Sequence, residues 1–325
     1  MIRVYLGLMP YFSTILRFIK LERQEKVSWL RILKSIYSHA SIFKTDLDWL
    51  HFGFGTLAIG GENIASAKNA DMAVSFRGFD IGVYPIKHPN CYQKTWSKVS
   101  KIHVISDDIA SLVFKHGFKG QAQIIKITPA IDTSHFHPSM QLNIESPLKL
   151  ISVARLHWKK GLNYTIQALA LLKQKGVKFE YRIIGKGPEE EALKFAAYQF
   201  GLQDQVIFMG RLESEDVKQE LAKSHIYIQY SVQEGFCNAV LEAQGMGLLS
   251  IVSDAEGLSE NVLDGKTGWV IDKRKPDLLA LKIKEVLELP EAQQNKIRNS
   301  AILRVQQHFN IENQQKAFIE FYKSN

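Results

Sequence analysis

The chain has 325 residues, of which 46% are hydrophobic and 23% are charged, and its formal net charge is +8. This length allows two domains with separate cores, and this composition excludes an intrinsically disordered protein. The two cysteines, Cys91 and Cys237, fit no metal-ligand spacing and indicate a reducing compartment, and no apolar run approaches the ~20 residues that a membrane-spanning helix needs.

The positive charge is concentrated in the first half of the sequence. Residues 1–148 hold 17 Lys and Arg against 11 Asp and Glu, a net charge of +6, whereas residues 149–325 hold 24 against 22, a net charge of +2. Apolar residues recur every three or four positions over residues 9–39, with Arg17, Lys20, Arg31 and Lys34 between them, which predicts one or two amphipathic helices. Such helices either contact an anionic membrane surface or pack on the sheet of their own domain. The sequence has no zinc spacing, RNA-binding signature or Arg-rich block, so no nucleic-acid partner is expected.

Strands and helices are predicted to alternate from residue 47 onward. Strands are expected at residues 48–52, 72–76, 103–105 and 124–128, and helices at residues 63–68 and 108–115. A long loop that contains Pro85 and Pro89 is expected before the third of these strands. The alternation favours a parallel, doubly wound sheet.

The same alternation continues in the second half, where strands are predicted at residues 148–154, 181–184, 206–212 and 248–253 and helices at residues 163–175 and 309–322. A loop that ends near Asn238 precedes a helix that carries Glu242. Strand ends and helix starts of this kind converge at the ligand-binding edge of an open α/β sheet. Carboxylates placed there, such as Glu234 and Glu242, can accept hydrogen bonds from sugar hydroxyls. The alternative is that these acidic residues only complement the helix dipole.

Residues 231–270 carry a family pattern. It consists of E-G-F followed by E-A, with two glutamates eight positions apart, then G-x-x-S-I-V-S and G-L-S-E-N-V-L-D-G-K-T-G-W-V. This pattern resembles the retaining glycosyltransferases of family 4, also called glycosyltransferase group 1, and it is similar to bacterial exopolysaccharide and colanic-acid-type enzymes. The resemblance runs from about residue 48 to the C-terminus and is dense over residues 148–271.

The resemblance implies the GT-B fold, an α/β fold with two Rossmann-like, doubly wound parallel-sheet domains and an interdomain cleft. Residues 1–145 would form the acceptor-side domain and residues 146–325 the nucleotide-sugar domain, with the last helix returning toward the first domain. Only about 45 residues precede the first strand, without the family's usual Gly-rich loop. The first βαβ portion is therefore expected to be missing or reduced, which would expose one edge of the sheet. The chain is then either a natural short form or one whose start is misplaced.

The resemblance also implies a donor site. Arg155 and Lys160 would bind the diphosphate, and Glu234 would lie beside the donor sugar; these three are the expected catalytic residues. Glu242 would hold the ribose hydroxyls. The other expected donor contacts are Gly210, Arg211, Leu212, Gly235, Phe236 and Asn238. The alternative for Arg155 and Lys160 is that they are solvated loop cations.

Two further features receive no firm site role. Arg77 stands where the family often has His, and an arginine cannot act as a general base, although it can pair with a phosphate. The turn Gly185-Lys186-Gly187 lacks the third glycine of a dinucleotide-binding fingerprint.

The resemblance implies transfer of a sugar from a nucleotide diphosphate sugar, of the UDP or GDP type, to a hydroxyl of a glycan or lipid-linked acceptor. The reaction would retain the configuration at the anomeric carbon and serve the assembly of bacterial surface polysaccharide or lipopolysaccharide. No metal and no cofactor besides this co-substrate are expected, and the protein would be cytoplasmic or peripheral at the inner face of the cytoplasmic membrane. The alternatives are a nucleotide-sugar epimerase of the same fold, a nucleotide-sugar-binding protein without transfer activity, and a basic scaffold on the membrane surface.

Overall fold

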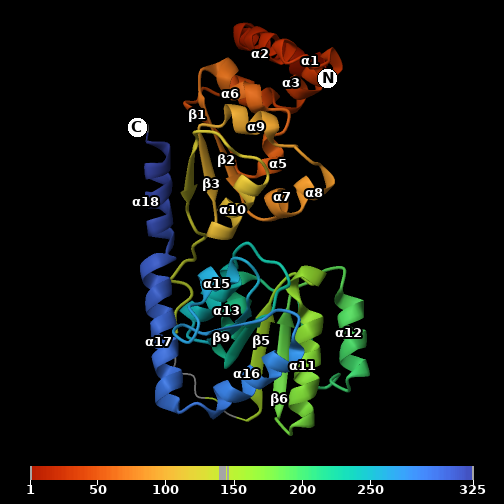
Figure 1. The fold of residues 1–325 in the computed structure, drawn as a ribbon, viewed down its shortest axis with the longest axis vertical. Coiled ribbons are helices and arrows are strands. Elements are labelled where there is room, and N and C mark those ends of the chain that lie inside the picture. Colours follow the sequence, from red (N-terminus) through yellow and green to blue (C-terminus); the bar gives the residue numbers. More distant parts are fainter. Residues whose placement is uncertain (1, 139–143, 145, 324–325) are drawn as a thin grey trace. The chain divides into compact units, whose positions relative to one another are not determined.

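The computed structural model describes residues 2–138, 144 and 146–323, with side chains from residue 4 onward. The chain divides into two compact units: unit 1 comprises Met1–Ile127 with Glu320–Asn325, and unit 2 comprises Thr128–Ile319. Each unit contains one parallel sheet with helices packed against it (Figure 1). The domain boundary expected between residues 145 and 146 involves residue 145, which lies outside the described residues.

Unit 1 is built on a four-stranded parallel sheet in the order β1-β2-β3-β4. The strands are β1 (Trp49–Phe52), β2 (Asp71–Phe76), β3 (Lys101–Val104) and β4 (Gln123–Lys126). In the register, Phe52 lies opposite Val74, and Val74 lies opposite Ile102. Strands β2 and β3 are buried along almost their whole length, as is usual for parallel strands covered on both faces. The four strands predicted for this half are confirmed.

The connections of unit 1 are more helical than expected. Helices α5 (Gly55–Ala58) and α6 (Glu62–Lys68) link β1 to β2, and α10 (Asp107–Lys115) links β3 to β4. The prediction of a long loop around Pro85 and Pro89 is wrong, because this segment forms α7 (Phe79–Gly82), α8 (Tyr84–Lys87) and α9 (Gln93–Lys98). Pro85 lies in the first turn of α8, where a helix needs no N–H donor.

The N-terminal segment forms α1 (Ile2–Leu6), the 3-10 helix η1 (Met9–Tyr11), α2 (Phe12–Gln24), α3 (Trp29–Ser38) and α4 (Ala40–Lys44). The predicted amphipathic helices are thereby confirmed. Helix α2 packs against α6, and the fully buried Phe18 of α2 has its ring centroid 5.3 Å from that of Phe43. Ile32 and Ile36 bury the inner side of α3. In Figure 1 these helices, drawn in red, lie on the outside of unit 1 beyond α6 and α9.

The end of α18 (Ile311–Tyr322) belongs to unit 1 and packs on the sheet face that carries Trp49 and His51. The ring of Phe321 stacks on that of His51 with 5.6 Å between centroids. The Nζ atom of Lys101 donates a hydrogen bond of 2.8 Å to the carbonyl oxygen of Phe321. These contacts attach the C-terminal residues of the chain to the first sheet.

A chain of hydrogen bonds runs across the same face of the sheet. His51 contacts the Tyr322 hydroxyl through Nδ1 and the Ser75 hydroxyl through Nε2 at 2.8 Å. The Ser75 hydroxyl also lies 2.7 Å from Nδ1 of His103, whose Nε2 donates to the Ile127 carbonyl oxygen at 2.9 Å. Burial lowers the pKa of both His51 and His103 to about 4, so both rings are neutral at neutral pH.

Unit 2 contains a six-stranded parallel sheet in the order β10-β9-β8-β5-β6-β7. The strands are β5 (Leu148–Val153), β6 (Phe179–Ile184), β7 (Val206–Gly210), β8 (Ile226–Gln229), β9 (Leu249–Ser253) and β10 (Trp269–Ile271). The strands predicted around β5, β6, β7 and β9 are confirmed, whereas the short strands β8 and β10 were not predicted from the sequence. The strand order reverses at β5. Strands β6 and β7 are added on one side of β5, and β8, β9 and β10 are then added on its other side.

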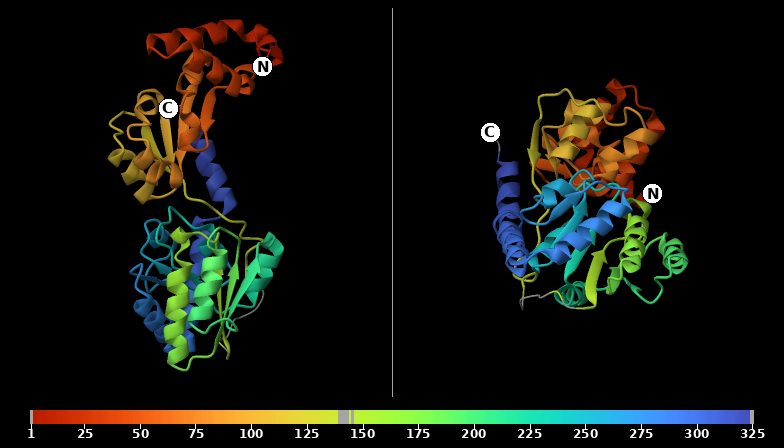
Figure 2. Two further views of the ribbon diagram at one scale, coloured as in Figure 1. Left: turned by 90° about the vertical axis from the view of Figure 1, so that its right-hand side faces the viewer. Right: turned by 60° about the horizontal axis from the view of Figure 1, so that its bottom comes forward.

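Helices cover both faces of this sheet (Figure 2). They are α11 (Leu162–Gln174), α12 (Glu190–Gln199), α13 (Ser214–Ala222), α14 (Asn238–Gly245), α15 (Leu258–Asn261), α16 (Pro276–Glu288) and α17 (Glu291–His308), with the 3-10 helix η2 (Trp158–Lys160). Helix α11 packs against α16, and Leu150 and Ile166 belong to the core that they share. Helix α14 packs against α17 and against β8 and β9. None of the described helices is both long and apolar enough to cross a membrane.

Candidate functional site

A pocket of about 640 Å³ lies at the carboxyl ends of the strands of unit 2. It is situated where the strand order reverses, since β5 has β6 on one side and β8 on the other. Open α/β sheets bind their ligands at such a switch point. Segments that follow β5, β6, β7 and β8 line the pocket: Val153, Ala154, Arg155, Lys160, Ile184, Gly185, Arg211, Leu212, Val217, Phe236, Cys237, Asn238, Ala239 and Glu242.

Most of the predicted donor-site residues meet in this pocket. Those that line it are Arg155, Lys160, Arg211, Leu212, Phe236, Asn238 and Glu242. The other three do not line it. Gly210 accepts a hydrogen bond of 2.7 Å from the Gly185 amide, Glu234 pairs with Lys160, and Gly235 precedes the lining residue Phe236, with its carbonyl packed against Gly257. The fold thus brings together three segments that are far apart in sequence.

The rear of the pocket depends on a glycine that received no role in the sequence analysis. Gly185 follows β6 with φ of +142°, and a Cβ atom there would lie 1.9 Å from the carbonyl oxygen of Ala154. A side chain at this position would therefore push apart the ends of β5 and β6. The two glycines of the Gly185-Lys186-Gly187 turn are the sequence feature that permits this close approach. The sequence does not show that β5 lies next to β6, so the reason for these glycines could not be predicted.

The ion pair between Lys160 and Glu234 forms one side of the site. Lys160 Nζ contacts Glu234 Oε2, and the two side chains are only 20% and 12% exposed. The loop that carries Lys160 is held by Gly161, which has φ of +63° and whose Cβ position would lie 2.0 Å from the Tyr230 carbonyl oxygen. The Ser231 hydroxyl also donates to Glu234 Oε2, at 3.2 Å. The fold therefore fixes both members of the pair before any ligand binds.

The charges around the pocket are set by burial and by this pair. Burial works to lower the pKa of Lys160, but the Glu234 carboxylate that pairs with its ammonium outweighs burial and holds that pKa above its usual value, so the ammonium stays charged. Burial raises the pKa of the Cys237 thiol to about 12, which keeps this thiol neutral. Burial also raises the pKa of Glu242, which lines the pocket from α14.

Three of the pocket's charged groups remain open to a ligand. The guanidinium groups of Arg155 and Arg211, which are both exposed, and the carboxylate of Glu242 have no hydrogen-bond or ion-pair partner among the described residues. An arginine offers a fork of donors to a phosphate, and a carboxylate accepts from hydroxyl groups. The pocket can therefore accommodate a ligand that combines anionic oxygens with a diol.

A second loop, at residues 254–261, holds the Glu234 segment in place. The Glu234 amide donates to Glu256 Oε2 at 2.9 Å, and Glu256 in turn pairs with Lys273 at 3.0 Å. Asn261 exchanges two hydrogen bonds with the Cys237 backbone, at 3.0 and 3.1 Å. Glu256 and Asn261 were not identified as functional from the sequence. Asn261 is the last residue of the G-L-S-E-N motif. The motif therefore includes this position, but it does not predict that Asn261 binds the Cys237 backbone.

Arg77 lies in unit 1, after β2, and is exposed. Its amide donates to Asp80 Oδ1 at 3.0 Å, and the amides of Gly55 and Gly78 donate to the same fully buried carboxyl group, each at 2.9 Å. Asp80 therefore organises the turn that carries Arg77, while the positive charge of Arg77 contributes to the lowered pKa of His51. A role of Arg77 in catalysis stays a prediction.

The described residues contain no group of three or more His, Cys, Asp and Glu side chains arranged to hold a metal ion. The charged groups that line the pocket are the side chains of Arg155, Lys160, Arg211 and Glu242.

Comparison with protein families gives one match over half of the chain. Residues 138–303 match the family Glycosyl transferases group 1. The sequence is 29% identical over 279 residues to the putative colanic acid biosynthesis glycosyltransferase WcaL of Escherichia coli (strain K12), a match that covers 83% of this chain and 68% of the relative. It is 30% identical to the amylovoran biosynthesis glycosyltransferase AmsK of Erwinia amylovora, over 73% of this chain and 60% of the relative.

Solved structures show the same fold at low sequence identity. A glycosyltransferase from Rickettsia africae ESF-5 superposes with a TM-score of 0.75 at 20% identity, over 94% of this chain and 86% of that one. HepE of Anabaena, in its complex with UDP-glucose, superposes with a TM-score of 0.76 at 18% identity, over 93% of this chain and 83% of that one. The expected GT-B fold is confirmed by these neighbours.

Proposed function

Because the chain belongs to the family Glycosyl transferases group 1, we propose that it moves a sugar from a nucleotide diphosphate sugar to a hydroxyl of a glycan or lipid-linked acceptor. The reaction retains the configuration at the anomeric carbon and uses no metal ion. The observation that carries this proposal is the pocket at the switch point of unit 2, where Arg155, Lys160 and Glu242 line one cavity. Two cations suit a diphosphate, and a carboxylate suits the vicinal diol of a ribose.

The donor occupies the pocket in a defined direction. Residues 210–212 border the base, Glu242 binds the ribose, and Arg155 and Lys160 bind the diphosphate. Glu234, fixed by Lys160 and Ser231, lies beside the sugar. HepE of Anabaena was crystallised with UDP-glucose, which supports a donor of the UDP type.

The protein's contribution to the chemistry is electrostatic. The bond between the anomeric carbon and the diphosphate oxygen breaks with its electron pair leaving on the diphosphate, through an oxocarbenium-like state. The acceptor oxygen bonds to the same face of the sugar, and its proton passes to the departing diphosphate. Arg155 and the permanently charged Lys160 stabilise the charge that develops on the leaving group. The positions of both cations are set by the loop that follows β5.

The acceptor belongs to the assembly of bacterial surface polysaccharide. This part of the proposal is supported by WcaL and AmsK, which are named for colanic acid and amylovoran biosynthesis. A lipid-linked acceptor would be presented at the inner face of the cytoplasmic membrane, where the protein acts as a peripheral protein.

The first test is binding of UDP and of GDP, measured as a change in melting temperature. A ligand that binds only the folded protein stabilises it by about 2.7 kcal/mol at a concentration 100 times its dissociation constant, so the melting temperature should rise by several degrees. Glu242→Gln should remove most of this rise, whereas Glu191→Gln, at an exposed acid of α12, should leave it intact. Hydrolysis or transfer of the corresponding nucleotide sugar is then measured.

The outcomes separate the competing functions. Stabilisation with slow donor hydrolysis and retained configuration supports the proposed transferase. Stabilisation without turnover identifies a nucleotide-sugar-binding protein, and conversion of the donor to its epimer without an acceptor identifies an epimerase. If neither nucleotide changes the melting temperature, the assignment of the pocket as a donor site is wrong.

A further inference from the structure

The N-terminal helices of unit 1 expose an unusual number of large apolar side chains. Leu6, Met9, Phe12, Leu16, Trp29, Leu30, Leu33 and Tyr37 are between 44% and 68% exposed. Single exposed apolar residues are common on protein surfaces, but an apolar cluster of this kind marks an interaction site.

These side chains share one surface. On α2, Phe12 and Leu16 are one helical turn apart and point away from the buried Phe18. On α3, Leu33 and Tyr37 have the same spacing. Helices α1 and α3 are joined because the Tyr5 hydroxyl donates to the Leu33 carbonyl oxygen at 2.9 Å. We refer to this surface, made by the exposed residues of α1, η1, α2 and α3, as the outer face.

Cations continue the same surface. Lys20 and Arg23 follow Phe12 and Leu16 along α2 at the spacing of one helix face. The Arg23 guanidinium lies 5.2 Å from the ring centroid of Trp29, so charge and apolar surface are in direct contact. Every Lys and Arg between residues 4 and 44 is exposed: Arg17, Lys20, Arg23, Lys26, Arg31, Lys34 and Lys44.

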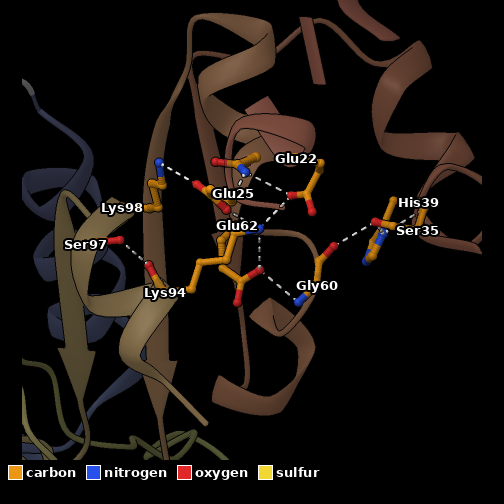
Figure 3. Close-up of polar contacts among 10 residues, drawn as sticks. Glu22, Glu25, Ser35, His39, Gly60, Glu62, Lys94, Ser97 and Lys98 are labelled. Carbon is orange, nitrogen blue, oxygen red and sulfur yellow. Dashed lines mark hydrogen bonds and ion pairs between the residues drawn. The ribbon is translucent and has the colours of Figure 1, made fainter. Parts of the chain in front are cut away.

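The carboxylates of this segment are paired with lysines of α9. Glu22 and Glu25 are the only acidic residues between positions 1 and 44. Lys94 of α9 binds Glu22 at 2.6 Å and Glu25 at 2.8 Å, and Lys98 binds Glu25 at 3.0 Å (Figure 3). Asn63 of α6 donates to both carboxylates, at 2.9 and 3.1 Å. Both negative charges are therefore neutralised by lysines of unit 1, and within the described part of the chain no ion pair is formed by the cations of residues 4–44.

We propose that the outer face docks on the surface of an anionic lipid bilayer, with its apolar side chains inserted among the headgroups and its cations beside the lipid phosphates. An interfacial amphipathic helix has this combination of exposed apolar residues with Lys and Arg. A second copy of the chain is a poorer occupant, because a symmetric dimer buries the same surface of both copies, and this surface offers cations without carboxylates to pair with them. This docking is independent of the proposed transfer reaction.

The test is flotation of the purified chain with two kinds of vesicle. One kind is pure phosphatidylcholine, and the other contains about 30% phosphatidylglycerol. The chain should float with the anionic vesicles and not with the neutral ones, and high salt should weaken this binding because it screens the electrostatic attraction.

Two variants and a matched control locate the contact. Lys20→Gln with Lys34→Gln should weaken binding to anionic vesicles by about 30-fold, since each surface cation contributes about 1 kcal/mol. Phe12→Ser with Leu33→Ser should weaken it by at least about tenfold. Lys175→Gln with Lys178→Gln removes the same charge from exposed positions in unit 2 and should have no effect. The lysine variants change exposed side chains only, so they test the proposal even if the apolar variant fails to fold.

Other results would overturn the proposal. One is equal binding to neutral and anionic vesicles, and another is an equal loss of binding in the unit 2 control. A third is a dimer in light scattering that Phe12→Ser with Leu33→Ser dissociates, with no flotation of the parent chain, which would make the outer face a protein–protein interface. UDP-dependent stabilisation is measured on the same samples, so a failure of membrane docking is distinguished from a failure of the proposed donor site.

Discussion

Both units contain a cluster of paired lysines and glutamates, and the two clusters serve different purposes. In unit 2, Lys160 pairs with Glu234 at the border of the pocket. In unit 1, Lys94 pairs with Glu22 and Glu25, and the Glu22 side chain is only 4% exposed. Each cluster places charges where burial would be costly without a partner.

The difference lies in the charged groups beside each pair. Next to Lys160, the pocket still contains Arg155 and Glu242, which have no hydrogen-bond or ion-pair partner within the described residues. In unit 1, Lys98 and Asn63 complete the bonding of the two carboxylates. An ion pair thus indicates a site only when neighbouring polar groups remain available. Otherwise the ion pair only holds parts of the structure together, as the pairs of Lys94 with Glu22 and Glu25 do in unit 1.

The largest effect is expected from breaking the unit 2 cluster. Arg155→Ala and Glu234→Ala should each lower kcat/KM for the nucleotide sugar by about 10²–10³-fold, because in the proposed reaction each removes a charged group next to the donor. Steady-state donor turnover measures this effect, with Glu191→Ala as the control. Near-full activity in either variant would contradict the site assignment.

Breaking the unit 1 cluster should affect stability instead of activity. Lys94→Met leaves Glu22 and Glu25 without their shared partner and should lower the free energy of unfolding by roughly 3 kcal/mol. The control is Lys282→Met, which removes an exposed pair with Glu285 and should cost less than about 1 kcal/mol. Chemical denaturation measures both. The same cost for the two variants would mean that the unit 1 cluster is no more than a surface ion pair.

The smallest effect per residue concerns the histidines of unit 1. The pKa of His51 and of His103 is about 4 in the folded protein, against an ordinary value of about 6.5. The unfolded chain therefore binds more protons between these values, so stability is lost as the pH falls from about 6.5 to about 4. The loss should be roughly 2 kcal/mol for each of the two histidines, and His103→Gln should remove the contribution of His103. Denaturation at pH 7 and at pH 4.5 tests this; a slope unchanged by His103→Gln would assign the titration elsewhere.

Much of the fold was predictable because its signals are local. Apolar runs with glycine or proline at their ends marked β1 to β7 and β9, and the apolar spacing over residues 9–39 marked α2 and α3. The two short strands β8 and β10 were missed, since three or four residues carry too little pattern to stand out. The segment with Pro85 and Pro89 was misread as a loop, because proline in the first turn of a helix resembles proline in a turn.

Seven of the ten residues expected at the donor site, on the resemblance that is dense over residues 148–271, line the pocket of unit 2. The mutual contacts of these residues were not predictable from the sequence, and their role stays a prediction. The pairing of Lys160 with Glu234 joins positions 74 residues apart. The close approach of Gly185 to Ala154 requires β5 and β6 to be neighbours.

The sequence by itself determined the fold class, the principal strands of the two sheets and the residue types that line the pocket of unit 2, because spacing and residue type can be read along the chain. The tertiary structure alone decided which charges meet and which stay open, because those contacts depend on strand order and helix orientation. Thus Glu234 and Glu22 are both glutamates paired with a lysine, yet Glu234 lies at the border of a pocket, whereas Glu22 connects α2 to α9. The burial of Glu22 and the pairing of Glu25 with Lys94 and Lys98 also leave the exposed cations of the N-terminal helices without an acidic partner among the described residues.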